Sequence, residues 1–144
     1  MTRFLTKIIA TLLVSAAFVA CNPGFLSEQD ILNGDGVLVI NGIVYDQTEG
    51  TPVEDIKIVF NAYQSEKSDR VLLTRTEYTS SKGVYLIRVE GLSENIFCRI
   101  SAEDEKGIYS SCSTSVNVTW NGNAYDKGTN TFAVNGCNFH LPKK

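Results

Sequence analysis

The sequence predicts an all-β fold, a seven-stranded, two-sheet Greek-key sandwich. Short runs in which apolar and polar residues alternate follow one another from Val37 onward. Gly, Asp, Asn and Ser residues separate these runs, and no apolar stripe at helical spacing follows residue 20. The length of 144 residues corresponds to one ordinary domain. We therefore expect the sandwich at residues 37–144, behind a cleaved signal segment.

The first 20 residues have the composition of a signal peptide. Arg3 and Lys7 make the start of the chain positive, and residues 8–19 are apolar or small throughout. This run is shorter than the ~20 residues that a membrane-spanning helix needs. We therefore expect residues 1–20 to be absent from the mature protein.

Cys21 directly follows Phe18, Val19 and Ala20. This stretch resembles the lipobox of bacterial lipoproteins, in which the cysteine is acylated and becomes the first residue of the mature chain. Phe18 stands where that motif usually has Leu. The resemblance implies that Cys21 carries palmitate or a similar lipid and holds the protein to a membrane of the cell envelope, the outer membrane. Each buried CH₂ adds about 0.8 kcal/mol, so that two or more acyl chains anchor stably.

Residues 21–36 are polar and rich in turn-forming residues, which is typical of a flexible tether. Removal of residues 1–20 takes away two positive charges, so the formal net charge changes from −3 to −5. A mildly acidic domain lacks the basic surface of nucleic-acid-binding proteins, and no nucleic-acid partner is expected.

Seven strands are expected in the domain, and each is bounded by a turn or a charged loop. In chain order they cover residues 37–45, 53–63, 71–79, 84–89, 96–102, 108–118 and 132–141. Because side chains alternate between the two faces of a strand, Cys98, Cys112 and Cys137 are all expected to face inward.

Two stretches together resemble the carboxypeptidase-regulatory-like domains, which are transthyretin-like sandwiches. Residues 40–60 read INGIVYDQTEGTPVEDIKIVF, and residues 75–89 read RTEYTSSKGVYLIRV, with Ser where the family's turn usually has Asp. With the leader and the final CNFHLPKK, the chain is similar to small Bacteroidetes lipoproteins found beside radical-SAM genes. The resemblance implies a fold and an envelope location. It implies no catalytic residue, since such domains are usually binding or structural modules.

Three cysteines remain if Cys21 is acylated, and an odd number allows at most one internal bridge. Either all three are buried thiols, or one disulfide forms, Cys98–Cys137 or Cys112–Cys137. No Cys-x-x-Cys pair or nearby His completes a ligand set, so we expect no metal and no other cofactor.

The remaining candidates favour a protein that is not an enzyme. His140, the only histidine, has no oriented catalytic partner nearby, and we expect it on the surface. Trp120 and Tyr125 lie in a long polar loop, where aromatic faces beside Asn and Asp can hold a sugar ring. Alternatively, Trp120 closes one end of the sandwich as part of the core.

The sequence therefore favours a non-enzymatic envelope lipoprotein, anchored to the membrane, whose domain binds or supports an unidentified envelope protein or glycan. One alternative is a carbohydrate- or peptide-binding accessory module that uses Trp120 and Tyr125. A second alternative, implied by the resemblance alone, is a substrate of a radical-SAM maturation system.

Overall fold

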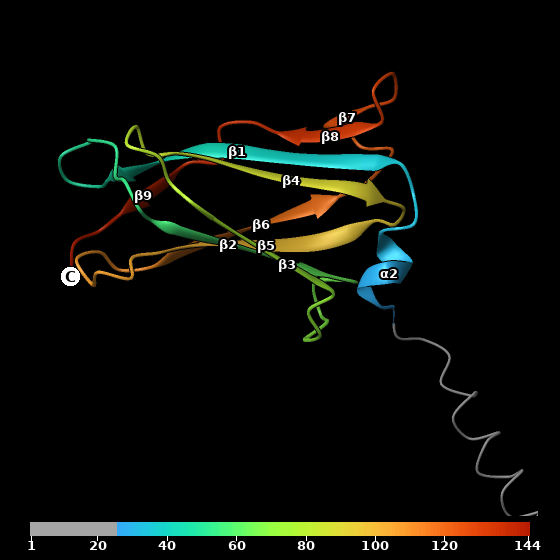
Figure 1. The fold of residues 1–144 in the computed structure, drawn as a ribbon, viewed down its shortest axis with the longest axis horizontal. Helices are drawn as coiled ribbons and strands as arrows, with labels where there is room; N and C mark the ends of the chain where they lie inside the picture. The colour runs from blue at the N-terminus through green and yellow to red at the C-terminus, as the bar shows by residue number, and fades with distance from the viewer. Residues whose placement is uncertain (1–25) are drawn as a thin grey trace, which may run out of the picture.

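The computed structural model describes residues 26–144, which form two packed β-sheets with one short helix at one end (Figure 1). The all-β sandwich expected from the sequence is confirmed. The elements in chain order are α2 (Glu28–Ile31), β1 (Gly36–Asp46), β2 (Lys57–Tyr63), β3 (Leu73–Tyr78), β4 (Val84–Leu92), β5 (Ile96–Glu103), β6 (Cys112–Val118), β7 (Tyr125–Asp126), β8 (Thr131–Val134) and β9 (Phe139–Leu141).

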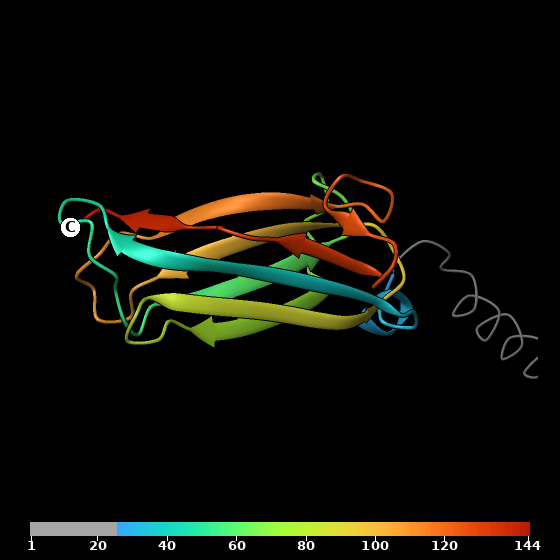
Figure 2. The same ribbon diagram turned by 90° about the horizontal axis from the view of Figure 1, so that it is seen from above.

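The first sheet, called here the β1 sheet, has the strand order β4-β1-β8-β7, and β9 also pairs with β1. Strand β1 runs antiparallel to β4 but parallel to β8 and β9. The second sheet, called here the β5 sheet, has the order β3-β2-β5-β6 and is antiparallel throughout. Figure 2 shows the strands of both sheets running along the same long axis of the molecule.

The core lies between the two sheets and is built by alternation along each strand. In β1 every second residue is buried, and β2 and β4 follow the same period. Phe60 of β2 and Ile100 of β5 are cross-strand partners, and neither is exposed to solvent. Among residues 26–144, no helix is long and apolar enough to cross a membrane.

The expected tether was wrong for residues 26–36, because this segment belongs to the folded domain. The Ser27 hydroxyl accepts a hydrogen bond from the backbone N–H of Asp30, and the Asp30 carboxylate accepts one from the N–H of Ser27. This capping box starts α2, and Ile31 at the end of α2 is fully buried. The expectations for the signal peptide, for Cys21 and for residues 22–25 lie outside the described residues.

The strand boundaries differ from the expected ones where turns interrupt an apolar pattern. The segment before β2 is a turn in which Asp55 takes a φ of 62°, so the strand begins at Lys57 rather than at residue 53. The expected last strand is divided into β8 and β9, and the two-residue strand β7 lies in the expected long loop. The described residues therefore contain nine strands rather than seven.

The break between β8 and β9 is built around Asn41 and Gly42 of β1. The Asn41 backbone carbonyl accepts a hydrogen bond from Cys137 N at 2.9 Å. The Asn41 side chain donates a hydrogen bond to the side chain of Asn135 and accepts one from the N–H of Gly136. The Cys137 carbonyl then occupies the space beside Gly42 that a side chain would need. The Tyr85 hydroxyl donates a hydrogen bond to this carbonyl. The returning chain thus turns inward where β1 carries no side chain.

Candidate functional site

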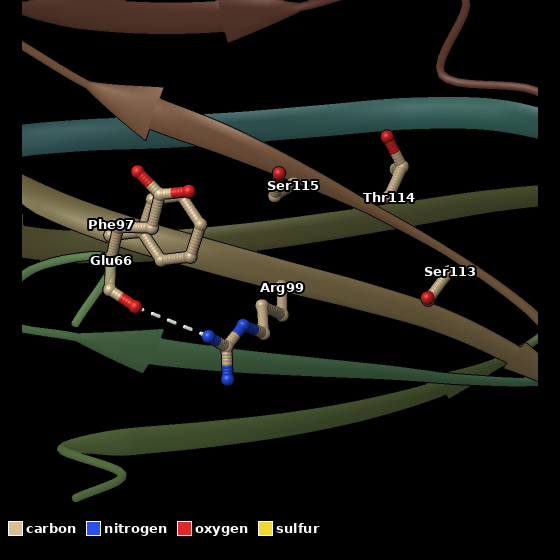
Figure 3. Close-up of a pocket in the computed structure, with 6 residues that line it drawn as sticks. All are labelled: Glu66, Phe97, Arg99, Ser113, Thr114 and Ser115. Atoms are coloured by element: carbon tan, nitrogen blue, oxygen red, sulfur yellow. Dashed lines mark hydrogen bonds between the residues drawn. The ribbon is translucent and has the colours of Figure 1, made fainter. Parts of the chain in front are cut away.

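A hollow of about 270 Å³ lies on the outer face of the β5 sheet. We call it the Arg99 hollow, and Figure 3 shows the residues that line it. They are Glu66, Phe97, Arg99, Ser113, Thr114 and Ser115. Its walls come from β5, from β6 and from the segment between β2 and β3.

Strand pairing brings the polar residues of the Arg99 hollow together. Arg99 of β5 lies opposite Ser115 of β6, and Ser101 lies opposite Ser113. Directly opposed residues of an antiparallel pair share a face, so Arg99, Ser113 and Ser115 all project from the outer face. The polar composition of β6 follows from its place at the edge of the sheet, where most of its residues are exposed.

Two aromatic rings hold the Arg99 side chain in place. Its guanidinium carbon lies 4.8 Å from the ring centroid of Tyr63 and 5.5 Å from that of Phe97. Both distances are within the range of cation–π attraction. Arg99 also donates a hydrogen bond from Nη2 to the backbone carbonyl of Glu66 at 3.2 Å. The guanidinium is therefore positioned by the protein although its residue is exposed.

The sequence pattern did not single out Arg99, although the alternation that turns Cys98 inward turns Arg99 outward. The register between β5 and β6 decides which residues lie beside it, and register depends on pairing between segments that the sequence pattern does not specify. The run Ser113-Thr114-Ser115, polar on both faces of a strand, was the signal that could have indicated a solvent-exposed edge.

The structure brings Trp120 and Tyr125 together, with ring centroids 5.7 Å apart in an edge-to-face arrangement. The Trp120 ring also meets Phe132 edge to face, and its Nε1 donates a hydrogen bond to the Glu94 carbonyl at 2.8 Å. Both aromatic residues are partly buried against the core, and Trp120 also lies against Gly36. Trp120 thus closes this end of the sandwich, and a role for Trp120 and Tyr125 in ligand binding stays a prediction.

Cys98, Cys112 and Cys137 are free thiols, so the structure forms no Cys98–Cys137 bridge. Cys98 is fully buried, and burial raises the pKa of its thiol to about 12. Cys112 and Cys137 are only partly buried, and Cys137 lies between β8 and β9 rather than on a strand. The expectation that all three lie on strands therefore holds for Cys98 and Cys112 and was wrong for Cys137, although Cys112 and Cys137 both pack against the core.

His140 lies on the surface, as expected, and its ring stacks on Tyr45 with 5.2 Å between centroids and 17° between planes. No group of three or more His, Cys, Asp or Glu within residues 26–144 is arranged to hold a metal ion.

A buried carboxylate, Asp46, lies at the end of the molecule opposite α2. It accepts hydrogen bonds from the backbone N–H groups of Thr48 and Glu49 and from the Tyr109 hydroxyl, and Lys143 Nζ lies 3.3 Å away. The hydrogen bond from the Glu49 N–H lowers the pKa of Asp46 most, and burial of the carboxylate raises this pKa. The bonds from Tyr109, Thr48 and Lys143 also lower it, and the resulting pKa is about 2, below the usual 3.8. These contacts tie the end of β1 to the C-terminal segment.

Asp46→Asn is expected to reduce the loss of stability in acid. Because the pKa is lower in the folded protein, the ionised Asp46 stabilises the fold above pH 3.8, and this contribution is lost as the pH falls through about 2. Wild type should therefore lose more stability than Asp46→Asn between pH 5 and pH 2, in denaturant unfolding followed by circular dichroism. Glu49→Gln, which removes an exposed carboxylate bound to the same lysine, should keep the wild-type dependence. Equal slopes for wild type and Asp46→Asn would refute the assignment.

Comparison of the sequence with models of known protein families gives no match, and comparison with curated proteins gives none either. Solved structures do resemble the fold. The major plantain pollen allergen Pla l 1 aligns with a TM-score of 0.50 at 13% identity, over 76% of this chain and 95% of that chain. At this identity the likeness shows the fold alone.

Catechol dioxygenases are also among the similar solved structures. The 3-chlorocatechol 1,2-dioxygenase from Rhodococcus opacus 1CP has a TM-score of 0.47 at 18% identity, over 77% of this chain and 61% of that chain. The catechol 1,2-dioxygenase of Acinetobacter radioresistens has a TM-score of 0.48 at 18% identity, over 76% and 53%. The chain thus spans between half and two thirds of the length of these enzymes, and the relationship is a distant one of fold.

Proposed function

We propose that the protein is a non-enzymatic lipoprotein of the bacterial cell envelope, anchored through Cys21, whose sandwich domain binds or supports a partner. The observation that carries the proposal is the position of Cys21, directly after a segment with a positive start and a short apolar run. The resemblance to lipoproteins with carboxypeptidase-regulatory-like domains supports the same reading.

The arrangement of the domain is compatible with an anchor at Cys21. The folded part begins at α2, at one end of the sandwich, and the C-terminus lies at the other end (Figure 1). Five residues separate Cys21 from Ser27, and a fully extended chain spans at most about 3.5 Å per residue step, or about 20 Å in all. A lipid on Cys21 would therefore keep the α2 end near the membrane and turn the Asp46 end away from it.

The absence of a catalytic set among residues 26–144 supports a non-enzymatic role. The chain has a single histidine, so a facial triad of two His and one carboxylate, which holds iron in many oxygenases, cannot be built from it. That histidine is exposed and stacked on Tyr45, and the raised pKa of Cys98 keeps its thiol protonated at neutral pH.

The test of the anchor is Cys21→Ala. We expect wild type to incorporate labelled palmitate, to begin at Cys21 and to sediment with membranes. Cys21→Ala should incorporate no palmitate and lose the acylated N-terminal peptide in mass spectrometry. Cys112→Ala is the matched control, because Cys112 is a partly exposed thiol of the folded domain, and it should be acylated at Cys21 like wild type. An unacylated wild-type protein in the soluble fraction would contradict the proposal.

The second candidate is a module that binds a small polar ligand, and the Arg99 hollow favours it. The same role at Trp120 and Tyr125 has less support, because Trp120 packs against Tyr125, Phe132 and Gly36. Binding of wild type to a glycan array that is lost in Trp120→Ala would nevertheless support a ligand site at Trp120 and Tyr125. A role as a radical-SAM substrate rests on the resemblance alone.

A further inference from the structure

The Arg99 guanidinium has hydrogen-bond donors that the protein does not use. A guanidinium carries five N–H donors and stays charged at any physiological pH. Arg99 uses one of the five, in its bond to the Glu66 carbonyl. Within residues 26–144, Arg99 takes part in no ion pair. The positive charge is thus held in a fixed place by Tyr63 and Phe97 with no carboxylate bound to it.

Two further donors line the same hollow, on the β6 side, whereas the guanidinium points toward the Glu66 carbonyl (Figure 3). Ser115 is the direct cross-strand neighbour of Arg99, and Ser113 follows on the same face. Neither hydroxyl bonds to another residue of the described chain, so both are available to a ligand. The Glu66 carboxylate lines the same hollow, above Phe97 in Figure 3, and supplies an acceptor.

This combination determines the chemistry of the ligand. A planar guanidinium and hydroxyl donors match a carboxylate or another oxyanion. The Glu66 carboxylate disfavours a group with two or more negative charges and favours a hydrogen-bond donor next to the anionic group. A hollow of about 270 Å³ is slightly smaller than the ~300–1,000 Å³ of small-molecule sites, so it fits a ligand no larger than an amino acid or a single sugar unit.

We propose that the Arg99 hollow binds a small organic carboxylate that carries a hydroxyl or ammonium group near its carboxylate, as sugar acids and amino acids do. The carboxylate accepts from Arg99, and the donor of the ligand bonds to Glu66. The inference deepens the binding role proposed above, and it does not depend on the lipid anchor.

The test is a titration of the purified, isotope-labelled protein followed by NMR, with two matched pairs of probes. D-galacturonate is compared with neutral D-galactose, and L-alanine with L-alaninamide. We expect saturable shifts at Ser113, Ser115 and the Arg99 Nε–H with at least one carboxylate, and binding of its partner without the carboxylate to be weaker by about tenfold or more. The pair that responds tells a sugar acid from an amino acid as the source of the carboxylate.

Arg99→Lys keeps the positive charge but removes the planar fork, and we expect it to weaken carboxylate binding by about tenfold. Arg88→Lys is the matched control: Arg88 is an exposed arginine on the other sheet, and its replacement should leave the titration unchanged. Glu66→Gln should retain carboxylate binding but reduce the preference for L-alanine over L-lactate. Circular dichroism of each variant verifies its fold.

Three outcomes would overturn the inference. The first is that neither D-galacturonate nor L-alanine gives a saturable shift at up to about 10 mM, a concentration well above the dissociation constant expected of a small-ligand site. The second is equal binding of the charged and neutral partners in both pairs. The third is an equal loss in Arg88→Lys and Arg99→Lys. Because binding is measured on the purified protein, none of these outcomes depends on whether Cys21 is acylated.

Discussion

Gly42→Ala is expected to destabilise the domain by about 3 kcal/mol or more, at the upper end of overpacking effects. A Cβ at this position would overlap the backbone carbonyl of Cys137, and it would lie 2.9 Å from Cε1 of Tyr85. The carbonyl cannot simply move aside, because the Tyr85 hydroxyl bonds to the Cys137 carbonyl and the Asn41 carbonyl bonds to the Cys137 N–H. The methyl group therefore forces the segment between β8 and β9 away from β1.

Gly128→Ala is the control for this substitution. Gly128 lies in an exposed loop, and the nearest neighbour of an added Cβ is the Asp126 carboxylate at 3.3 Å, an atom at the end of a flexible side chain. Urea unfolding followed by circular dichroism should show a lowered free energy of unfolding for Gly42→Ala and a value within about 0.5 kcal/mol of wild type for Gly128→Ala. A Gly42→Ala protein as stable as wild type would mean that the chain does not enter the space beside Gly42.

Phe60→Ala is expected to cost about 3–5 kcal/mol of the free energy of unfolding. Phe60 is at the centre of β2, is fully buried, and pairs with Ile100 of β5 across the sheet. Removing the ring withdraws its apolar surface from the core and leaves a cavity between two sheets that cannot close completely. For a domain of this size the melting temperature should fall by roughly 10–20 °C.

Leu86→Ala provides the matched comparison for Phe60→Ala. Leu86 is also a large apolar residue on a strand, but its side chain is on the outer face of β4 and the residue is 51% exposed. Its replacement should change the unfolding free energy by no more than about 0.5 kcal/mol. Comparable losses in the two variants would show that the outer face of β4 is covered in solution, as at an interface with another chain.

Much of the sandwich could be predicted from local pattern. The alternation of β1, β4 and β5 follows from side chains that point to opposite faces, and the structure has these strands within a few residues of their expected ends. The prediction failed at α2, where the capping box at Ser27 and the burial of Ile31 outweigh a polar composition typical of a tether. It failed again at Cys137, where Gly42 on a distant strand decides the path of the chain.

The candidate site was the least predictable part. The alternation that turns Cys98 inward also turns Arg99 outward, but nothing local indicates that the rings of Tyr63 and Phe97 lie near its guanidinium or that Ser115 lies opposite it on β6. These contacts join three separate segments, and they depend on the register of β2 and β6 against β5.

The sequence by itself determined the all-β class, the inward and outward faces of most strands, and the expectation that Cys21 is an acylated N-terminus. These conclusions rest on neighbouring residues, because periodicity and processing signals are local properties of a chain. Only the tertiary structure decided that the last strand divides around Gly42, that Trp120 closes one end of the sandwich, and that an arginine without a carboxylate partner lies in a hollow with two free hydroxyls. Each of these depends on strand pairing between distant segments, since register and packing bring together residues that the sequence keeps apart.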